Sequence, residues 1–345
     1  MSACRSGVKA GNWLAVVLGA IREHPHQSCG EAHRISGDEA VRIRFDGLHS
    51  SSGTLLERYV SLFRLDAAPK YRLARPPLNQ AFVEVRFPVQ AGLATMEGIA
   101  PLQQQLSTFF PYLRHQQVQQ VSLLVSPGAP ANAETQTAHT WRFEDDAGWT
   151  LVLAPDSAVL SIGPQYSEFR EFSDRFRAAL SALGASAGVP RANRLGVRYL
   201  NIAEIPPGDE RAWQRWFRPE LTGWSGTDLI GDSKLITSLT QTQLAAPPVG
   251  ELSGPPVDVQ AIVRHGVIPG STIVPGAVPA QPQLPSYLID LDVFVDAPQP
   301  FDPEELSRQV TVFHDQIDRF FYWAMTDDGA AYFGCEVVDG DDNSL

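Results

Sequence analysis

The chain has 345 residues, of which 43% are hydrophobic, so it can bury a substantial core in one large or two ordinary domains and is not globally disordered. Its net charge of −12 argues against general binding to nucleic acid backbones, which requires a basic surface. The three scattered cysteines, Cys4, Cys29 and Cys335, make no disulfide framework, which predicts a reducing cytoplasm.

Residues 1–74 differ from the remainder of the chain. They are basic overall, whereas the remainder is strongly acidic. The apolar run 13–21 follows basic residues as in a signal sequence, but it is too short to span a bilayer and no cleavage site follows. We predict an N-terminal extension that is either loosely docked or translated from upstream DNA. No metal site is predicted there, because no common zinc module has the spacing of His24, His26, Cys29 and His33.

Periodic patterns begin after residue 75. In a first part, residues 75–189, helical spacing predicts helices at 93–110, with a kink at Pro101, and at 166–183. Period-two alternation predicts strands at 82–89, 117–125, 139–144, 149–153 and 158–162.

A second part, residues 190–327, is predicted to start with a strand at 194–201 and to end with a helix at 303–326. Between them we predict a short helix at 211–217 and strands at 234–245, 257–264 and 286–295. The orders β-α-β-β-β-β-α and β-β-β-β-α predict an α+β fold, in which helices pack on one face of antiparallel sheets and two halves are loosely similar. Residues 328–345 are predicted as an acidic tail.

Three of these strands each carry two charged residues on one face, because side chains alternate along a strand. The pairs are Glu84 and Arg86, Arg194 and Arg198, and Asp290 and Asp292. Three interpretations are open: a structural network of cross-strand ion pairs, which is favoured, an arginine clamp for a phosphate or carboxylate ligand, and a catalytic cluster. Gly196, between the two arginines, would suit a bulge or the close approach of a ligand.

Catalytic and cofactor motifs are missing from the sequence. It contains no glycine-rich phosphate loop, no dinucleotide fingerprint and no nucleophile elbow, so it predicts no catalytic residue and no cofactor. Asp290 and Asp292 could bind Mg²⁺, but arginine pairing or solvent exposure is favoured, and no metal is predicted. The remaining histidines, His115, His139, His265 and His314, are far apart in the sequence. His314 is predicted to lie on a helix surface.

Aromatic and basic residues alternate over residues 211–224. This mixture can stack single-stranded nucleic acid, but the acidic chain favours a helix that packs its aromatic face. The residues are Arg211, Trp213, Arg215, Trp216, Phe217, Arg218 and Trp224. The apolar seam of the helix at 303–326 is predicted to pack on the core, with a homodimer as the alternative.

An ordered set of short motifs extends over residues 75–327. It includes Pro76-Pro77-Leu78, Trp141-Arg142-Phe143 and an Arg-x-Gly-x-Arg-Tyr-x-Asn strand at 194–201. The set resembles a family of uncharacterised bacterial proteins of sporadic distribution. The resemblance implies an accessory gene, in a defence or mobile locus, and carries over no catalytic residue.

Together these patterns predict a cytoplasmic protein that is a non-enzymatic interaction or ligand-sensing component. Its partner would be an unknown protein or a small anionic ligand, with no membrane and no nucleic acid. The alternative is an enzyme for a phosphate- or carboxylate-bearing substrate. In that case Arg194 and Arg198 would clamp the anion, and Asp290 or Asp292 would act as acid, base or metal ligand.

Overall fold

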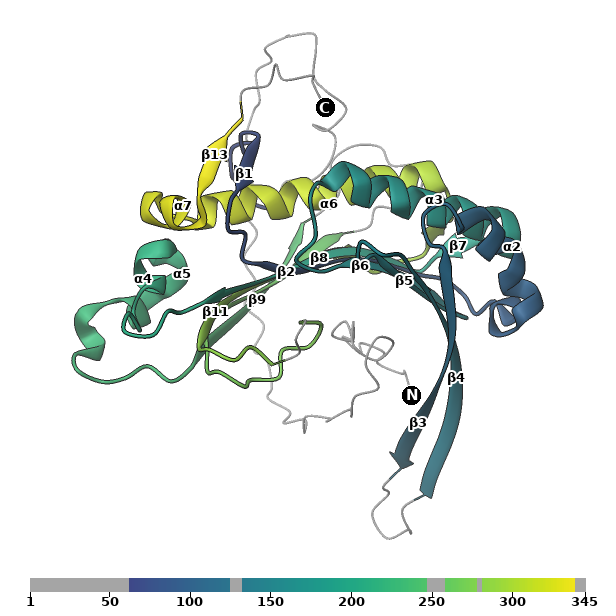
Figure 1. Ribbon diagram of the computed structural model, residues 1–345, viewed down its shortest axis with the longest axis horizontal. Coiled ribbons are helices and arrows are strands. Elements are labelled where there is room, and N and C mark those ends of the chain that lie inside the picture. The colour runs from purple at the N-terminus through teal and green to yellow at the C-terminus, as the bar shows by residue number, and fades with distance from the viewer. Residues whose placement is uncertain (1–61, 125–131, 247–257, 278–280, 339–345) are drawn as a thin grey trace, which may run out of the picture.

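A single antiparallel sheet of nine strands organises the protein (Figure 1). The computed structural model describes residues 62–124, 132–246, 258–277 and 281–338. The strand order is β3-β4-β5-β6-β2-β8-β11-β10-β9. The strands are β2 (Leu78–Arg86), β3 (Tyr112–Leu124), β4 (Asn132–Glu144), β5 (Thr150–Ala154), β6 (Ser157–Ile162), β8 (Arg194–Glu204), β9 (Ser238–Ala246), β10 (Val259–Ile268) and β11 (Ser286–Val295).

Three helices cover one face of this sheet, as predicted: α2 (Met96–Leu106), α3 (Phe169–Ala187) and α6 (Pro303–Ala324) (Figure 1). The side chain of Asp302 caps α6 by accepting the N–H groups of Glu304 and Glu305. The helix predicted at 93–110 is shorter, because a 3₁₀ turn, η2 (Ala91–Ala94), precedes it and Thr95 begins a new helix as its N-cap. Helix α2 continues through Pro101.

The hydrophobic core lies between the sheet and these helices. Alternate residues of each strand point to it, among them Val83 on β2, Val197 on β8 and Leu291 on β11, all at most 1% exposed. Since neighbouring side chains on a strand point to opposite faces, Glu84, Arg198 and the residues in register with them lie on the face away from the helices.

The two predicted halves share this one sheet. Strand β2, the first of one half, pairs with β8, the first of the other, with Val83 opposite Val197. On each side of this pair the last strand of the half comes next, β6 beside β2 and β11 beside β8. The loose similarity of the two halves stays a prediction.

The two ends of the described chain differ from the prediction. Within the predicted acidic tail, α7 (Asp327–Phe333) packs against Trp216, and β13 (Cys335–Val337) pairs with β1 (Tyr71–Leu73). Residues 62–73, predicted as part of the extension, lie on α6, where the Tyr71 hydroxyl donates to Asp318 at 2.8 Å. Residues 1–61, with the predicted histidine cluster, lie outside the described residues.

The aromatic segment at 211–224 is packed, as favoured from the sequence. Together with the residues up to 230 it forms four short helices, and Trp213, Trp216 and Phe217 are buried against Tyr287 and Phe333, while Trp224 is exposed. The short helices are α4 (Trp213–Trp216), α5 (Pro219–Thr222), η3 (Gly223–Gly226) and η4 (Asp228–Ile230). The remaining two-stranded sheet joins β7 (Arg191–Ala192) to β12 (Gln299–Pro300).

Candidate functional site

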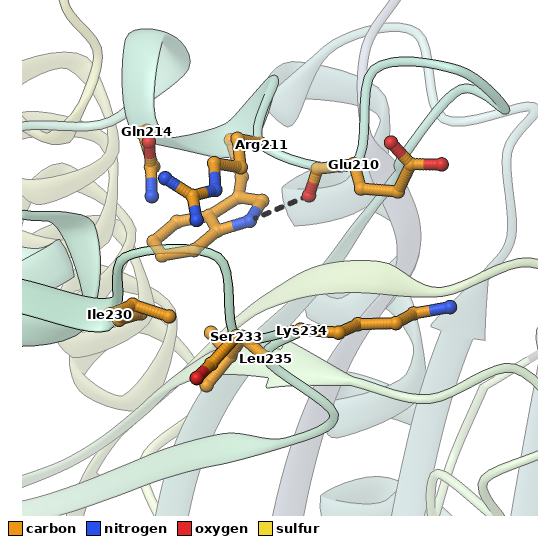
Figure 2. A pocket seen from close by; sticks show the side chains of 8 residues that line it. Glu210, Arg211, Gln214, Ile230, Ser233, Lys234 and Leu235 are labelled. Carbon is orange, nitrogen blue, oxygen red and sulfur yellow. Dashed lines mark hydrogen bonds between the residues drawn. The ribbon is translucent and has the colours of Figure 1, made fainter. Parts of the chain in front are cut away.

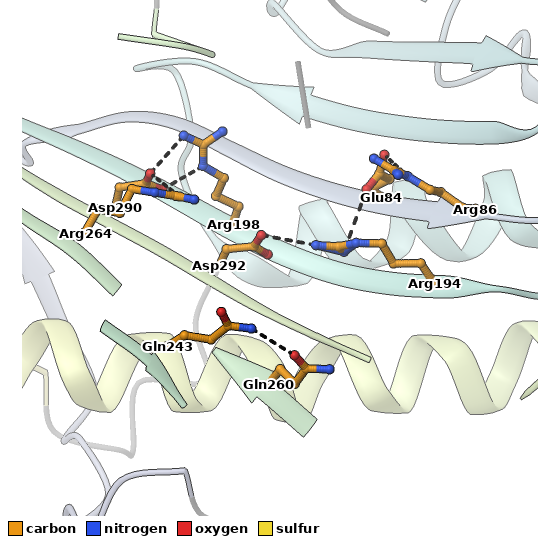
Figure 3. Close-up of polar contacts among 9 residues, drawn as sticks. All are labelled: Glu84, Arg86, Arg194, Arg198, Gln243, Gln260, Arg264, Asp290 and Asp292. Carbon is orange, nitrogen blue, oxygen red and sulfur yellow. Dashed lines mark hydrogen bonds and ion pairs between the residues drawn. The ribbon is translucent and has the colours of Figure 1, made fainter. Parts of the chain in front are cut away.

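All six charged residues singled out from the sequence meet on one face of three adjacent strands, β2, β8 and β11 (Figure 3). Arg198 lies opposite Asp292 in the register, and Arg86 lies opposite Arg194. This face is turned away from the helices, so the charges form a second, polar layer beneath the hydrophobic core.

The centre of the cluster is the pair formed by Arg198 and Asp290. The Arg198 Nε lies 2.6 Å from Asp290 Oδ1, and its Nη2 lies 2.9 Å from Oδ2, so the contact is bidentate. Both residues are buried, at 5% and 2% exposure. Burial lowers the pKa of Arg198, but the charge of Asp290 and its hydrogen bonds outweigh burial and raise it. Arg198 is therefore a permanent buried cation matched by a carboxylate.

Sequence reasoning missed a third member of this centre, Arg264 on β10. Its Nη1 donates to Asp290 Oδ2 at 3.0 Å, and its Nε donates to Gln241 Oε1 on β9 at 2.8 Å. Arg264 lies directly opposite both residues in the register. The pattern that could have revealed it is the alternation of β10, which places Arg264 on the face away from Val263 and the core.

A second centre forms around Arg194. Its Nη2 lies 3.2 Å from Asp292 Oδ2 and its Nη1 lies 3.8 Å from Glu84 Oε2, while Arg86 Nε lies 2.8 Å from Glu84 Oε1. The Arg194 guanidinium also lies over the ring of Phe294, 4.2 Å from its centroid. Arg194, Asp292 and Glu84 are at most 2% exposed. Each of the three carboxylates of the cluster therefore has an arginine partner.

Gly196 lies in regular register between the two centres, opposite Glu84 and Phe294. The bulge predicted there is wrong, because the register of this strand pair shifts between Leu78 and Gln80 instead. What approaches the cluster closely is another glycine, Gly276.

The segment that contains Gly276 covers Arg198. The carbonyl of Pro275 accepts a hydrogen bond from Arg198 Nη2 at 3.1 Å, and Val274 and Ala277 pack with Leu200 of β8. Gly276 has φ +90°, and a Cβ there would lie 3.0 Å from the Phe82 ring and 3.5 Å from Arg198 Nη1. Glycine is required at this position, because only glycine adopts this backbone without strain and leaves room for the guanidinium.

The cluster is thus a closed ion network more than an open clamp. Asp290 and Asp292, considered as Mg²⁺ ligands, both bind arginines. Among the described residues, no group of three or more His, Cys, Asp or Glu side chains is arranged to hold a metal ion. These contacts fix the register and spacing of β8, β11 and β10 through charge-assisted hydrogen bonds, and an ion pair between Arg194 and Glu84 adds β2.

A small hollow lies elsewhere, beside α4 (Figure 2). Trp213 forms one wall and donates its Nε1 to the Glu210 carbonyl at 3.2 Å, with Arg211 and Lys234 at the rim. It contains none of the six predicted residues.

His314 is not on the helix surface, contrary to the prediction. It is partly buried between α6, α3 and β8, with its ring stacked on Phe169 at 3.8 Å and its Nδ1 3.0 Å from the Tyr199 hydroxyl. Tyr199 in turn is hydrogen-bonded to Tyr166 at 2.8 Å. Burial lowers the pKa of His314 to about 3. This histidine is therefore a neutral hydrogen-bonding group of the core.

No known protein family matches the chain. No curated protein matches it either. The helices within the described residues are all too short or too polar to cross a membrane.

Proposed function

We propose that the protein is a non-enzymatic interaction component, encoded in an accessory locus, that binds an extended segment of a partner protein along the edge strand β9. The observation that carries the proposal is the composition of β9. Its nine residues, Ser238–Ala246, contain neither a charge nor a proline, although the strand ends the sheet.

Edge strands offer unpaired N–H and C=O groups to other chains, and monomeric proteins usually block them with charged residues, proline or a covering segment. In the part of the chain that the structure describes, β9 pairs with β10 alone. Five consecutive residues of β9, from Leu239 to Gln243, are exposed on both faces of the sheet. An added strand would therefore find main-chain partners and uncharged side chains along the whole edge.

The ion network connects to this edge. Arg264 links Asp290 of β11 to Gln241 of β9. Two residues further along β9, the Gln243 side chain donates to the Gln260 side chain of β10 at 3.2 Å (Figure 3). These contacts hold β9 in one register on β10. Because the edge strand is already held in place, less conformational entropy is lost when a partner binds, which favours recognition by strand addition.

The alternative enzyme requires an arginine turned towards a substrate. Arg198 instead donates hydrogen bonds from Nε and Nη2 to Asp290 and to the carbonyl of Pro275. Arg194 contacts both Asp292 and Glu84. This pairing supports a structural role for the network and leaves partner binding to the edge strand.

The test uses a library of random peptides displayed on phage and selected on the full chain. Selected peptides should lose binding to a Thr240→Lys/Thr242→Lys variant, because charges on an edge strand oppose strand addition. A matched control, Gln104→Lys/Thr108→Lys, adds the same charge to exposed positions at the end of α2 and should bind as the wild type does. Equal loss in both variants, or none in either, would overturn the proposal.

A further inference from the structure

Two histidines that are isolated in the sequence meet at the other edge of the sheet. His115 on β3 and His139 on β4 lie diagonally across the strand pair, since His115 is in register with Trp141. The Nε2 of His115 is 3.1 Å from the Nδ1 of His139. Their ring centroids are 5.3 Å apart and the ring planes differ by 7°. The two rings are therefore nearly parallel, and one nitrogen of each ring faces a nitrogen of the other.

His115 packs on a buried tryptophan. Its ring stacks on Trp141 with centroids 4.3 Å apart, and the Trp141 Nε1 donates to the Leu93 carbonyl at 2.7 Å. His139 is partly buried on the same face of the strand pair, whereas His115 is exposed. The His115 ring thus packs on the core through Trp141, and its other side faces solvent, so the histidine pair can be reached from solvent.

The separation of the two nitrogens fits a shared cation. Imidazole nitrogens bind Zn²⁺ at about 2.0–2.1 Å, so two ligands at a tetrahedral or right angle to one another are roughly 3 Å apart. If each ring carries its proton on the other nitrogen, both lone pairs face the space between the rings, and a tilt of both rings directs them at one ion.

We propose that His115 and His139 form a two-histidine site for a divalent first-row transition-metal ion, Zn²⁺, Ni²⁺ or Cu²⁺, which imidazole ligands suit. Water would complete the coordination, because the described residues add no third His, Cys, Asp or Glu ligand. A site with two protein ligands binds its ion exchangeably. The ion would join β3 to β4 where the ribbon extends beyond the sheet (Figure 1).

The test is calorimetric titration of the full chain with ZnCl₂ and NiCl₂. The wild type should bind one ion more than His115→Ala and one more than His139→Ala, since either substitution removes half of the ligands. Copper supplies a second readout, because electron paramagnetic resonance of Cu²⁺ bound to the wild type should show hyperfine coupling to two imidazole nitrogens.

Two controls separate this site from other metal binding. Arg114→Ala changes an exposed neighbour on the opposite face of β3 and should keep the wild-type stoichiometry. A His24→Ala/His26→Ala/His33→Ala variant should keep the ion that depends on His115. Equal stoichiometry in the wild type, His115→Ala and His139→Ala would overturn the proposal, as would loss of the ion only in the triple variant.

Discussion

Arg198 lies directly opposite Asp292 in the register of β8 and β11, yet its guanidinium binds both carboxylate oxygens of Asp290, two residues further along. This diagonal contact leaves Asp292 to Arg194 and brings Asp290 within 3.0 Å of Arg264 on β10. This displaced ion pair, together with Arg264, thus joins three strands: β8, β11 and β10. The network gives each buried carboxylate an arginine partner, which offsets part of the cost of burying the charges.

Arg198→Ala should lower the free energy of unfolding by about 3–5 kcal/mol, because it leaves the carboxylate of Asp290 buried with only the half-buried Arg264 as partner. Arg198→Met/Asp290→Leu removes both charges and should recover most of this loss. Urea unfolding of the wild type, Arg198→Ala and the double variant measures this recovery. A double variant no more stable than Arg198→Ala would contradict a paired structural network.

Arg264→Ala should act mainly on the edge strand. The side chain is 30% exposed, so its ion pair contributes about 1 kcal/mol or less to global stability. Its loss frees Gln241, and the amide hydrogens of β9 should exchange faster while those of β2 and β8 are unchanged. Hydrogen exchange with mass spectrometry detects this difference. Uniform acceleration over all strands would show that Arg264 has no special link to the edge.

Gly276→Ala should destabilise the protein by about 1–3 kcal/mol, because the residue has φ +90° and the added methyl group would press on Phe82. Gly92→Ala is the matched control, since a Cβ at Gly92 meets nothing within 4 Å. Thermal unfolding of the two variants should show a lower melting temperature for Gly276→Ala alone. Equal melting temperatures would mean that the segment over Arg198 is not closely packed.

His314 predicts a loss of stability in acid. Burial lowers its pKa in the folded protein to about 3, below the ordinary histidine value of 6.5 that applies in the unfolded chain. The unfolded state therefore binds a proton first as the pH falls below about 6.5, and the stabilisation present above that pH is lost down to about pH 3, at a rate of at most about 1.4 kcal/mol per pH unit. His314→Gln, which does not titrate, should unfold with a shallower dependence on pH between 6 and 4. Parallel pH profiles for the two proteins would refute this role of His314.

Much of the architecture could be predicted from local patterns. Alternation placed Glu84, Arg86, Arg194, Arg198, Asp290 and Asp292 each on a polar strand face, and the α+β fold with helices on one face is confirmed. Local patterns do not specify which strands are neighbours. The partners of each charge, the missed Arg264 and the meeting of His115 with His139 all depend on which strands pair and in which register.

The remaining differences also come from tertiary contacts. The acidic composition of residues 328–345 predicts a solvated tail, but α7 and β13 are stabilised by packing on Trp216 and by pairing with β1. His314 follows a core residue, Phe313, in the helical pattern. Its burial comes from Phe169 of α3 and Tyr199 of β8, which pack against it in the fold. In both cases the element that buries the residue is distant in the sequence.

The most direct test of the account is hydrogen exchange of the full chain with and without a peptide selected for binding to it. Strand addition predicts that the peptide protects amide hydrogens of residues 238–246, because the new main-chain hydrogen bonds form there. Protection should not extend to residues 274–277, which cover Arg198. Protection of residues 274–277 with no change along β9 would contradict the account and place binding at the ion network.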